Sequence, residues 1–188
     1  NLMDRAIISR TEKEAKEHVI LQNLDTSFQK IDELPFDFER RRMSVIVKDD
    51  SNVVSMVTKG ALEEMLNIST HVEYRGEVIP LTEDIRQEVL AEVGQLNRQG
   101  LRVLGVGYKS GLREDYAYTV TDERDMILTG YLAFLDPPKP SAAPAIQALL
   151  EHGVKTKILT GDNEKVTQAI CEKVGLDVEH ILLGADID

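Results

Sequence analysis

Apolar and polar residues alternate in several short runs between residues 28 and 110, the pattern of strands with one buried face. These runs predict strands over residues 28–34, 43–48, 53–58 and 101–108, and a short strand pair over 71–81. Pro35 is expected to end the first strand, because proline has no N–H to donate to a neighbour. The turn-forming residues 49–52 are expected to join the strands beside them into an antiparallel hairpin.

Other stretches have helical character. They predict helices over residues 2–9, 12–22, 62–68 and 82–100. In the first helix Leu2, Ala6 and Ile7 are expected to face the core, and in the longest Ile85, Val89, Val93 and Leu96. Thr82 suits the N-cap of that longest helix and Gly100 its C-terminal end. Residues 1–126 are therefore expected to form one domain of an α/β protein, an antiparallel sheet flanked by helices.

The character of the chain changes near residue 127. An apolar strand over 127–134 is followed by Asp136-Pro137-Pro138-Lys139-Pro140, which is stiff and is expected to act as a hinge. Beyond it the pattern predicts a helix over 141–152, a buried strand over 154–159, a helix over 164–174 and a strand over 181–183. This alternation favours a parallel sheet in a second domain, 127–188. Ligands of such sheets bind at the carboxyl ends of strands, where Thr160 to Asn163 lie.

Aromatic and basic residues gather just before the strand that begins at Met43. Phe36 and Phe38 precede the three cations Arg40-Arg41-Arg42. An aromatic face can stack on a planar base, and neighbouring cations can hold phosphates. The alternative is a solvated basic patch beside two core phenylalanines.

Three further sites hold residues that could contact a ligand: the Lys59-Gly60 corner, Arg102 and Asp4. Lys59 and Gly60 occupy the corner between a strand and a helix, where glycine lets a ligand approach the backbone and lysine offers a mobile charge. An ordinary turn with an exposed lysine is the alternative. Arg102 shares a strand face with apolar residues and so needs an anion or a carboxylate partner, the latter as a salt bridge to a neighbouring glutamate. Asp4, in a first helical turn, also suits a favourable helix-end charge.

Composition narrows the class of protein. The net charge of −11 argues against nucleic acid or an anionic membrane surface as a main partner. A membrane helix needs roughly 20 apolar residues in a row. The sequence has no such run and no signal peptide, and because it starts at Asn1 it is interpreted as an excised fragment. The single cysteine, Cys171, excludes an internal disulfide and fits a reducing, cytosolic location.

Taken in order, seven short motifs resemble those of P-type cation-transporting ATPases. They are Asp4-Arg5-Ala6, Pro35-Phe36, Arg41 to Val45, Lys59-Gly60-Ala61, Gly100 to Leu104, Asp136 to Lys139 and Thr160 to Asn163. The local sequence of the arginine run, residues 40–45, is most similar to that of the bacterial magnesium-transporting branch. The resemblance implies a nucleotide-binding domain followed by part of a haloacid-dehalogenase-like phosphorylation domain. It also implies a cytoplasmic location in a protein of the inner membrane, with ATP or ADP as ligand.

The resemblance also implies a role for individual residues. Phe36 matches the aromatic that stacks on adenine, Asp4 an acid at the adenine amino group, and Arg41 a cation along the nucleotide. Lys59 and Gly60 match the lining of the adenosine pocket, Arg102 the arginine that reaches the phosphates, and Asp136 the hinge aspartate. Thr160, Gly161 and Asp162 match the loop near the γ-phosphate and the phosphorylated aspartate. The chain departs from the usual pattern at Leu62, commonly proline, and at Asp4 and Arg41, commonly glutamate and lysine.

Two motifs of the family do not occur in this sequence: Asp-Lys-Thr-Gly-Thr, whose aspartate takes the phosphoryl group, and Gly-Asp-Gly-x-x-Asn-Asp, which helps hold Mg²⁺. Without nucleophile and metal clamp, these 188 residues are expected to bind nucleotide but not to turn it over. Mg²⁺, the rest of the phosphorylation domain, the actuator domain and the membrane helices are expected from the parent enzyme, an aspartyl-phosphate-forming magnesium transporter. No metal site is predicted within the chain. A regulatory nucleotide-binding module and a soluble haloacid-dehalogenase phosphatase with a large cap are the alternatives.

Overall fold

The computed structural model describes residues 2–15, 27–178 and 180–186. The chain divides into two compact units: Asn1–Thr82 with Leu104–Leu132, and Glu83–Val103 with Ala133–Asp188. The first unit holds most of the β-structure and the second most of the helices after residue 82. Compared with the predicted division after residue 126, residues 83–103 group with the C-terminal part.

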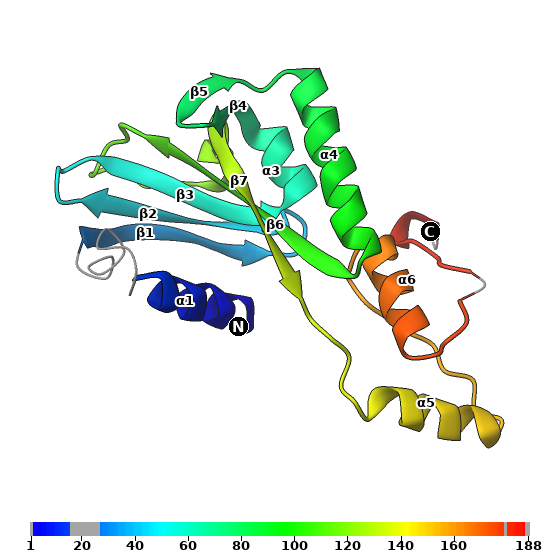
Figure 1. Cartoon of the computed structure of the whole chain (residues 1–188). Helices are drawn as coiled ribbons and strands as arrows, with labels where there is room; N and C mark the ends of the chain where they lie inside the picture. The colour runs from blue at the N-terminus through cyan, green and yellow to red at the C-terminus, as the bar shows by residue number, and fades with distance from the viewer. Residues whose placement is uncertain (1, 16–26, 179, 187–188) are drawn as a thin grey trace. The chain divides into compact units, whose positions relative to one another are not determined.

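Seven strands form one mixed sheet in the order β1-β2-β3-β6-β7-β4-β5 (Figure 1). Their bounds are β1 Phe28–Asp37, β2 Arg42–Asp49, β3 Val54–Ala61, β4 Ser69–Tyr74, β5 Glu77–Pro80, β6 Leu101–Ser110 and β7 Met126–Leu135. The pairs β1/β2, β2/β3, β3/β6 and β4/β5 are antiparallel, and β4 pairs with β7 in parallel. The predicted hairpin around residues 49–52 and the antiparallel pairing of β1, β2, β3 and β6 are confirmed. The strand predicted over 127–134 is formed as β7, but it joins this sheet beside β4 and does not begin a second sheet.

The helices are α1 Leu2–Ala15, α3 Leu62–Ile68, α4 Glu83–Arg98, α5 Ala142–Glu151 and α6 Glu164–Lys173, with short 3-10 turns at Val120–Asp122 and Gly184–Asp186. The predicted helices over 2–9 and 12–15 form one helix, α1; residues 16–22 lie outside the described residues. Ala6 is exposed and Ile7 half-buried, so the predicted buried face of α1 is wrong at Ala6. Gly100, with φ of 82°, ends α4 as predicted.

Strand β1 does not stop at Pro35, as the sequence predicted, but continues to Asp37. It lies at the edge of the sheet, where a residue without an N–H is tolerated because only one side of the strand is paired. The pairing with β2 also loses its register between Leu34 and Asp37. The end of β1 is therefore held less regularly by backbone hydrogen bonds than its middle.

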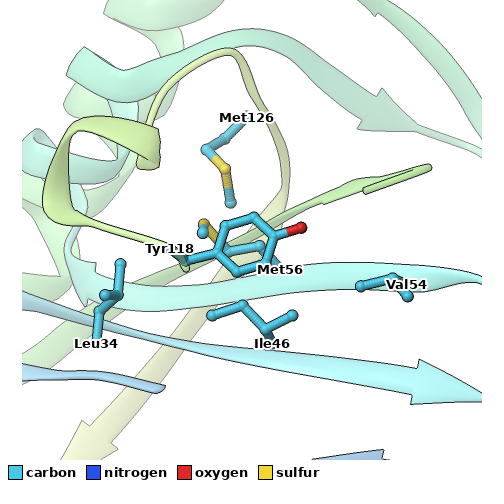
Figure 2. Packing of buried hydrophobic residues seen from close by; sticks show 6 residues of the cluster. All are labelled: Leu34, Ile46, Val54, Met56, Tyr118 and Met126. Carbon is cyan, nitrogen blue, oxygen red and sulfur yellow. The ribbon is translucent and has the colours of Figure 1, made fainter. Parts of the chain in front are cut away.

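The core of the first unit packs six buried side chains from strands β1, β2, β3 and β7 and from the segment after β6 (Figure 2). They are Leu34, Ile46, Val54, Met56, Tyr118 and Met126. In β2 it is Ser44 and Ile46 that are buried, whereas Met43, Val45 and Val47 share the half-buried opposite face.

Helix α3 packs onto the sheet through Leu62, Met65 and Leu66, the three apolar residues identified in the sequence. A Cβ added at Gly105 of β6 would lie 2.9 Å from the Cβ of Met65. Glycine is therefore needed in β6 for this helix to pack so closely. Because α3 directly follows β3, this packing fixes the position at which β3 ends.

In the second unit helix α4 packs against α6. Val93 of α4 and Val166, Ala169 and Cys171 of α6 are buried, while Ile85, Val89 and Leu96 are only half-buried. Burial raises the pKa of the Cys171 thiol, which keeps it in its unreactive protonated form.

The two strands predicted over 154–159 and 181–183 are not formed. Within the described residues after Leu135, no residue belongs to a strand. Leu159 is 97% exposed and Leu182 70% exposed, although the apolar runs predicted burial. A parallel strand is stable only between hydrogen-bonded neighbours with both faces covered. The predicted parallel-sheet segment is therefore absent from the structure of the described residues.

Candidate functional site

Three neighbouring strands bring four of the predicted site residues to one end of the sheet. Asp37 of β1 lies opposite Arg42 of β2, and Arg42 lies opposite Gly60 of β3. Phe36 therefore lies one residue before the end of β1, Arg41 directly precedes β2, and Lys59 and Gly60 lie just before the end of β3, all at the same edge of the first unit. Asp4 lies in α1, but its side chain is not among those that the structure describes.

The two phenylalanines at this edge are exposed. Phe36 is 50% exposed and Phe38 88% exposed, and their rings meet edge to face with centroids 5.3 Å apart. The alternative in which both belong to the core is therefore wrong. Together the two rings offer an exposed aromatic surface on which a planar base can stack.

The three arginines are paired with acids, which the sequence did not indicate. Nη1 of Arg40 lies 2.6 Å from Oε2 of Glu123, and Nε of Arg42 lies 2.8 Å from the same oxygen. The side chains of Arg40 and Arg42 are only 15% and 13% exposed. Arg41 is bonded to Glu64 at 2.5 Å and is 53% exposed. Arg41 is thus the arginine of the run best placed to meet a ligand from solvent.

Glu123 is the centre of a buried polar network. Its side chain is fully buried, and Ser44 donates to it at 2.7 Å while the Thr58 hydroxyl lies 2.8 Å from Ser44. Burial alone would raise the pKa of Glu123, but the hydrogen bonds from Arg40, Ser44 and Arg42 outweigh it and hold the pKa below its ordinary value. No local pattern in the sequence marks this residue, because its partners lie 79 to 83 positions away.

Gly60 is needed by the protein itself. A Cβ at this position would lie 2.4 Å from the Cβ of Arg42 and 2.7 Å from the carbonyl oxygen of Arg41. The Arg41 and Arg42 segment therefore lies directly against Gly60. Lys59 precedes it within β3, opposite Met43. The predicted strand-to-helix corner is confirmed, since β3 ends at Ala61 and α3 begins at Leu62.

The second unit gathers Arg102, Asp136 and Asp162. Nη2 of Arg102 donates to Oδ2 of Asp162 at 2.8 Å, and Nη1 lies 3.5 Å from Oδ2 of Asp136. Of the two kinds of partner expected for Arg102, an anion or a carboxylate, the structure shows the carboxylate, supplied by two aspartates in place of a glutamate. Its Nε is buried and has no hydrogen-bond partner in the described part of the chain.

Residues 160–163 form the loop that leads into α6. The Thr160 hydroxyl accepts from the backbone N–H of Asp162 at 3.1 Å, and Asn163 caps α6 by accepting from the N–H of Lys165 at 2.9 Å. A Cβ at Gly161 would meet no atom within 4 Å. Thr160 and Gly161 are exposed, and Asp162 is half-buried against Arg102. The loop therefore leaves its backbone open to a ligand.

Neither a metal-binding cluster nor a membrane-spanning helix occurs among the described residues. In that part of the chain no three His, Cys, Asp or Glu side chains gather as metal ligands. No described helix is both long and apolar enough to cross a membrane.

Comparison with known proteins identifies relatives over the whole chain. The family model "P-type ATPase, cytoplasmic domain N" matches residues 1–141. The protein named Magnesium-transporting ATPase, P-type 1, of Salmonella typhimurium strain 14028s is 47% identical over 188 residues, and the protein of that name in Escherichia coli K12 is 45% identical. Calcium-transporting ATPase 1 of Bacillus cereus is 30% identical over 88% of the chain and 19% of that protein.

The matches to the two magnesium-transporting proteins cover the whole of this chain. The chain itself spans only 20% of the length of each of these relatives. The family match covers both the aromatic edge of the first unit and the Arg102–Asp136 pair. These matches confirm the resemblance drawn from the ordered motifs. The chain belongs to the P-type ATPase family and contains the cytoplasmic domain N of such an enzyme, related to the bacterial magnesium-transporting members.

Proposed function

We propose that this chain is the ATP-binding part of a P-type ATPase that transports Mg²⁺ across the bacterial inner membrane. The identity to proteins named magnesium-transporting ATPases supports the ion. The chain spans about a fifth of their length, so the transport activity belongs to a longer protein that contains it. On this proposal the chain lies on the cytoplasmic side, joined to the actuator domain, the rest of the phosphorylation domain and the membrane helices.

The observation that carries the proposal is the exposed Phe36 at the edge shared by β1, β2 and β3. On this proposal adenine stacks on the Phe36 ring, and Asp4 meets its amino group. Lys59, next to Gly60, and Arg41 lie along the sugar and phosphates. Stacking on an aromatic ring is worth roughly 1–3 kcal/mol per base, enough for a weak but specific contact.

Arg102 is proposed to bind the phosphates of ATP. Its guanidinium has one buried N–H group, at Nε, that has no partner among the described residues, and this fits an incoming phosphate oxygen. Asp162 and Asp136 hold the other two nitrogens and so orient the plane of the group. Asp136 also begins the hinge segment. Thr160, Gly161 and Asp162 are proposed to support the transferred phosphoryl group.

Exposed apolar side chains in the second unit support the proposal that another part of the longer protein packs against them. Ile158, Leu159 and Leu182 are 41%, 97% and 70% exposed in segments whose sequence is typical of buried strands. On this proposal they join a haloacid-dehalogenase-like parallel sheet with other parts of the longer protein. That protein supplies the phosphorylated aspartate and, with Mg²⁺ bound, couples ATP hydrolysis through an aspartyl-phosphate to transport.

The first test is nucleotide binding by the 188-residue chain itself. Titration with ATP and ADP, followed by calorimetry or NMR, is expected to give a Kd on the order of 0.1–1 mM. Shifts in the NMR spectrum are expected at Phe36, Arg41, Lys59 and Gly60. Absence of binding at millimolar nucleotide would overturn the proposal. ATP hydrolysis by the isolated chain would also contradict it, because no phosphorylatable Asp-Lys-Thr-Gly-Thr is present.

A further inference from the structure

The two exposed phenylalanines lie at the end of β1 and in the turn that follows it, and Arg40 of this turn bonds to residues on both sides of Phe36. The backbone N–H of Arg40 donates to Oδ1 of Asp37 at 2.8 Å, and its Nη2 donates to the carbonyl oxygen of Pro35 at 2.7 Å. The Nε of Arg40 also bonds to Oδ2 of Asp37. Pro35 and Asp37 flank Phe36, and Asp37 separates Phe36 from Phe38. The contacts of Arg40 thus enclose the aromatic pair along the chain.

The same guanidinium is anchored in the interior. Its Nη1 lies 2.6 Å from Glu123, whose side chain is fully buried and 83 positions away in the sequence. Glu123 is fixed in turn by Arg42 at 2.8 Å and by Ser44 at 2.7 Å. Arg40 therefore connects an exposed turn to a rigid buried network, and its three guanidinium nitrogens each have a different acceptor atom.

The sheet alone does not provide this rigidity. The register of β1 with β2 is broken between Leu34 and Asp37, and Pro35 has no N–H to donate. Phe36 lies within this break and Phe38 lies beyond the strand. Side-chain bonds from Arg40 take the place of the regular ladder at this point.

We propose that Arg40 is a positioning residue for nucleotide binding, which holds Phe36 and Phe38 in the arrangement that receives the base. The inference rests on the proposed function. A contact surface that is ordered before binding loses less conformational entropy when the ligand arrives. Arg40 thus contributes to affinity without touching the nucleotide, in contrast to the role that its place in a basic run suggested.

The test compares Arg40→Ala with Ser44→Ala in the whole 188-residue chain. Both variants remove one hydrogen bond to Glu123, but Ser44 donates from inside β2 and only Arg40 reaches the turn. NMR titrations with ATP and with adenosine are the measurements. Arg40→Ala is expected to weaken binding of both ligands about tenfold and to shift the ring signals of Phe36 and Phe38. Ser44→Ala is expected to bind within about twofold of the unchanged chain.

Two further variants separate position from charge and from folding. Arg40→Lys keeps the positive charge but lacks the planar fork that spans three acceptors, so it is expected to lose nearly as much affinity as Arg40→Ala. Asp37→Ala removes the partner on the exposed side and is expected to weaken binding several-fold in a folded protein, because Asp37 is 46% exposed. This variant decides the question if Arg40→Ala does not fold.

The outcomes distinguish this inference from the proposed function. If the unchanged chain binds ATP and Phe36→Ala weakens it, but Arg40→Ala or Asp37→Ala binds normally, only the positioning role is overturned. Normal binding by Arg40→Lys would show that charge suffices and would overturn it as well. An equal loss in Ser44→Ala would assign the effect to the Glu123 network as a whole. Failure of the unchanged chain to bind ATP or adenosine contradicts the proposed function itself.

Discussion

Nη2 of Arg102 donates to Oδ2 of Asp162 at 2.8 Å, so two residues expected at one nucleotide site are bonded to each other. A phosphate that binds the Nε of Arg102 does not need the nitrogen that Asp162 occupies, but the negative charge of this carboxylate, on the same guanidinium, repels it. Both side chains are partly exposed, at 35% and 24%, and water therefore weakens the pair. The ion pair is expected to reduce nucleotide affinity modestly while it keeps the arginine oriented.

Replacing Asp162 by asparagine is accordingly expected to tighten ATP binding by the 188-residue chain. The asparagine preserves the size of the side chain but removes its charge, which leaves Arg102 with Asp136 as its acidic partner. Partly exposed ion pairs are worth about 0.2–1 kcal/mol, so the gain in affinity is expected to be at most about fivefold. Parallel titrations with ATP and adenosine are the measurement. Adenosine, which has no phosphate, is expected to bind unchanged; weaker ATP binding would contradict the repulsion.

Strand β1 offers a matched pair of phenylalanines. Phe36 and Phe28 lie near opposite ends of this strand and are 50% and 49% exposed. Phe36→Ala is expected to weaken ATP binding by about 1–3 kcal/mol, the scale of a lost base stack. Phe28→Ala is expected to leave affinity unchanged, and both variants should keep the melting temperature. Equal losses in the two variants would show that the effect is not a base contact.

Phe38 is the second ring to test by the same measurement. It is 88% exposed and meets Phe36 edge to face, so it can offer a face of its own to the base. A larger loss in Phe38→Ala than in Phe36→Ala would identify Phe38 as the residue that stacks. The sequence alone left this choice open.

Glu123 predicts how stability depends on pH. Its folded pKa is below the ordinary value of about 4.3, so it contributes stability that is complete above that pH and is lost as pH falls through the folded pKa. Glu123→Gln leaves Arg40 and Arg42 without their buried charge partner, which is expected to cost about 3–5 kcal/mol at pH 7. The variant should also lose less stability than the unchanged chain between pH 5 and pH 3.

Denaturant unfolding at several pH values measures this difference. Glu63→Gln, at an exposed position of α3, is the control and is expected to change stability by less than about 0.5 kcal/mol. An acid-unfolding curve of Glu123→Gln that matches the unchanged chain would show that other carboxylates cause the acid sensitivity.

The sequence predicted those parts of the fold that local patterns determine. Alternation gave the strands around the 49–52 turn, and Gly100 marked the end of α4, because turn and cap preferences act within a few residues. The strand over 154–159 was wrong because an apolar run becomes a strand only when neighbours are present to pair with it.

The site was predictable only in part for a related reason. The ordered motifs pointed to Phe36, Lys59 and Arg102, and the structure exposes the first and pairs the last with aspartates. The partners of Arg40 and Arg42 were missed, because Glu123 is more than 80 positions distant and only the folded chain brings it close. A run of arginines in a sequence therefore does not reveal which of them are internally neutralised.

Gly60 provides the last prediction, because the structure gives a different reason for this glycine than the sequence did. A Cβ at residue 60 would lie 2.4 Å from the Cβ of Arg42, so Gly60→Ala must push β2 and β3 apart. Such overpacking is expected to destabilise the chain by about 1–3 kcal/mol even without nucleotide. Gly161→Ala is the control: its Cβ would meet no atom within 4 Å, and stability should not change. If Gly60→Ala instead unfolds at the same denaturant concentration as the unchanged chain and only loses affinity for ATP, close approach of the ligand is the reason for the glycine.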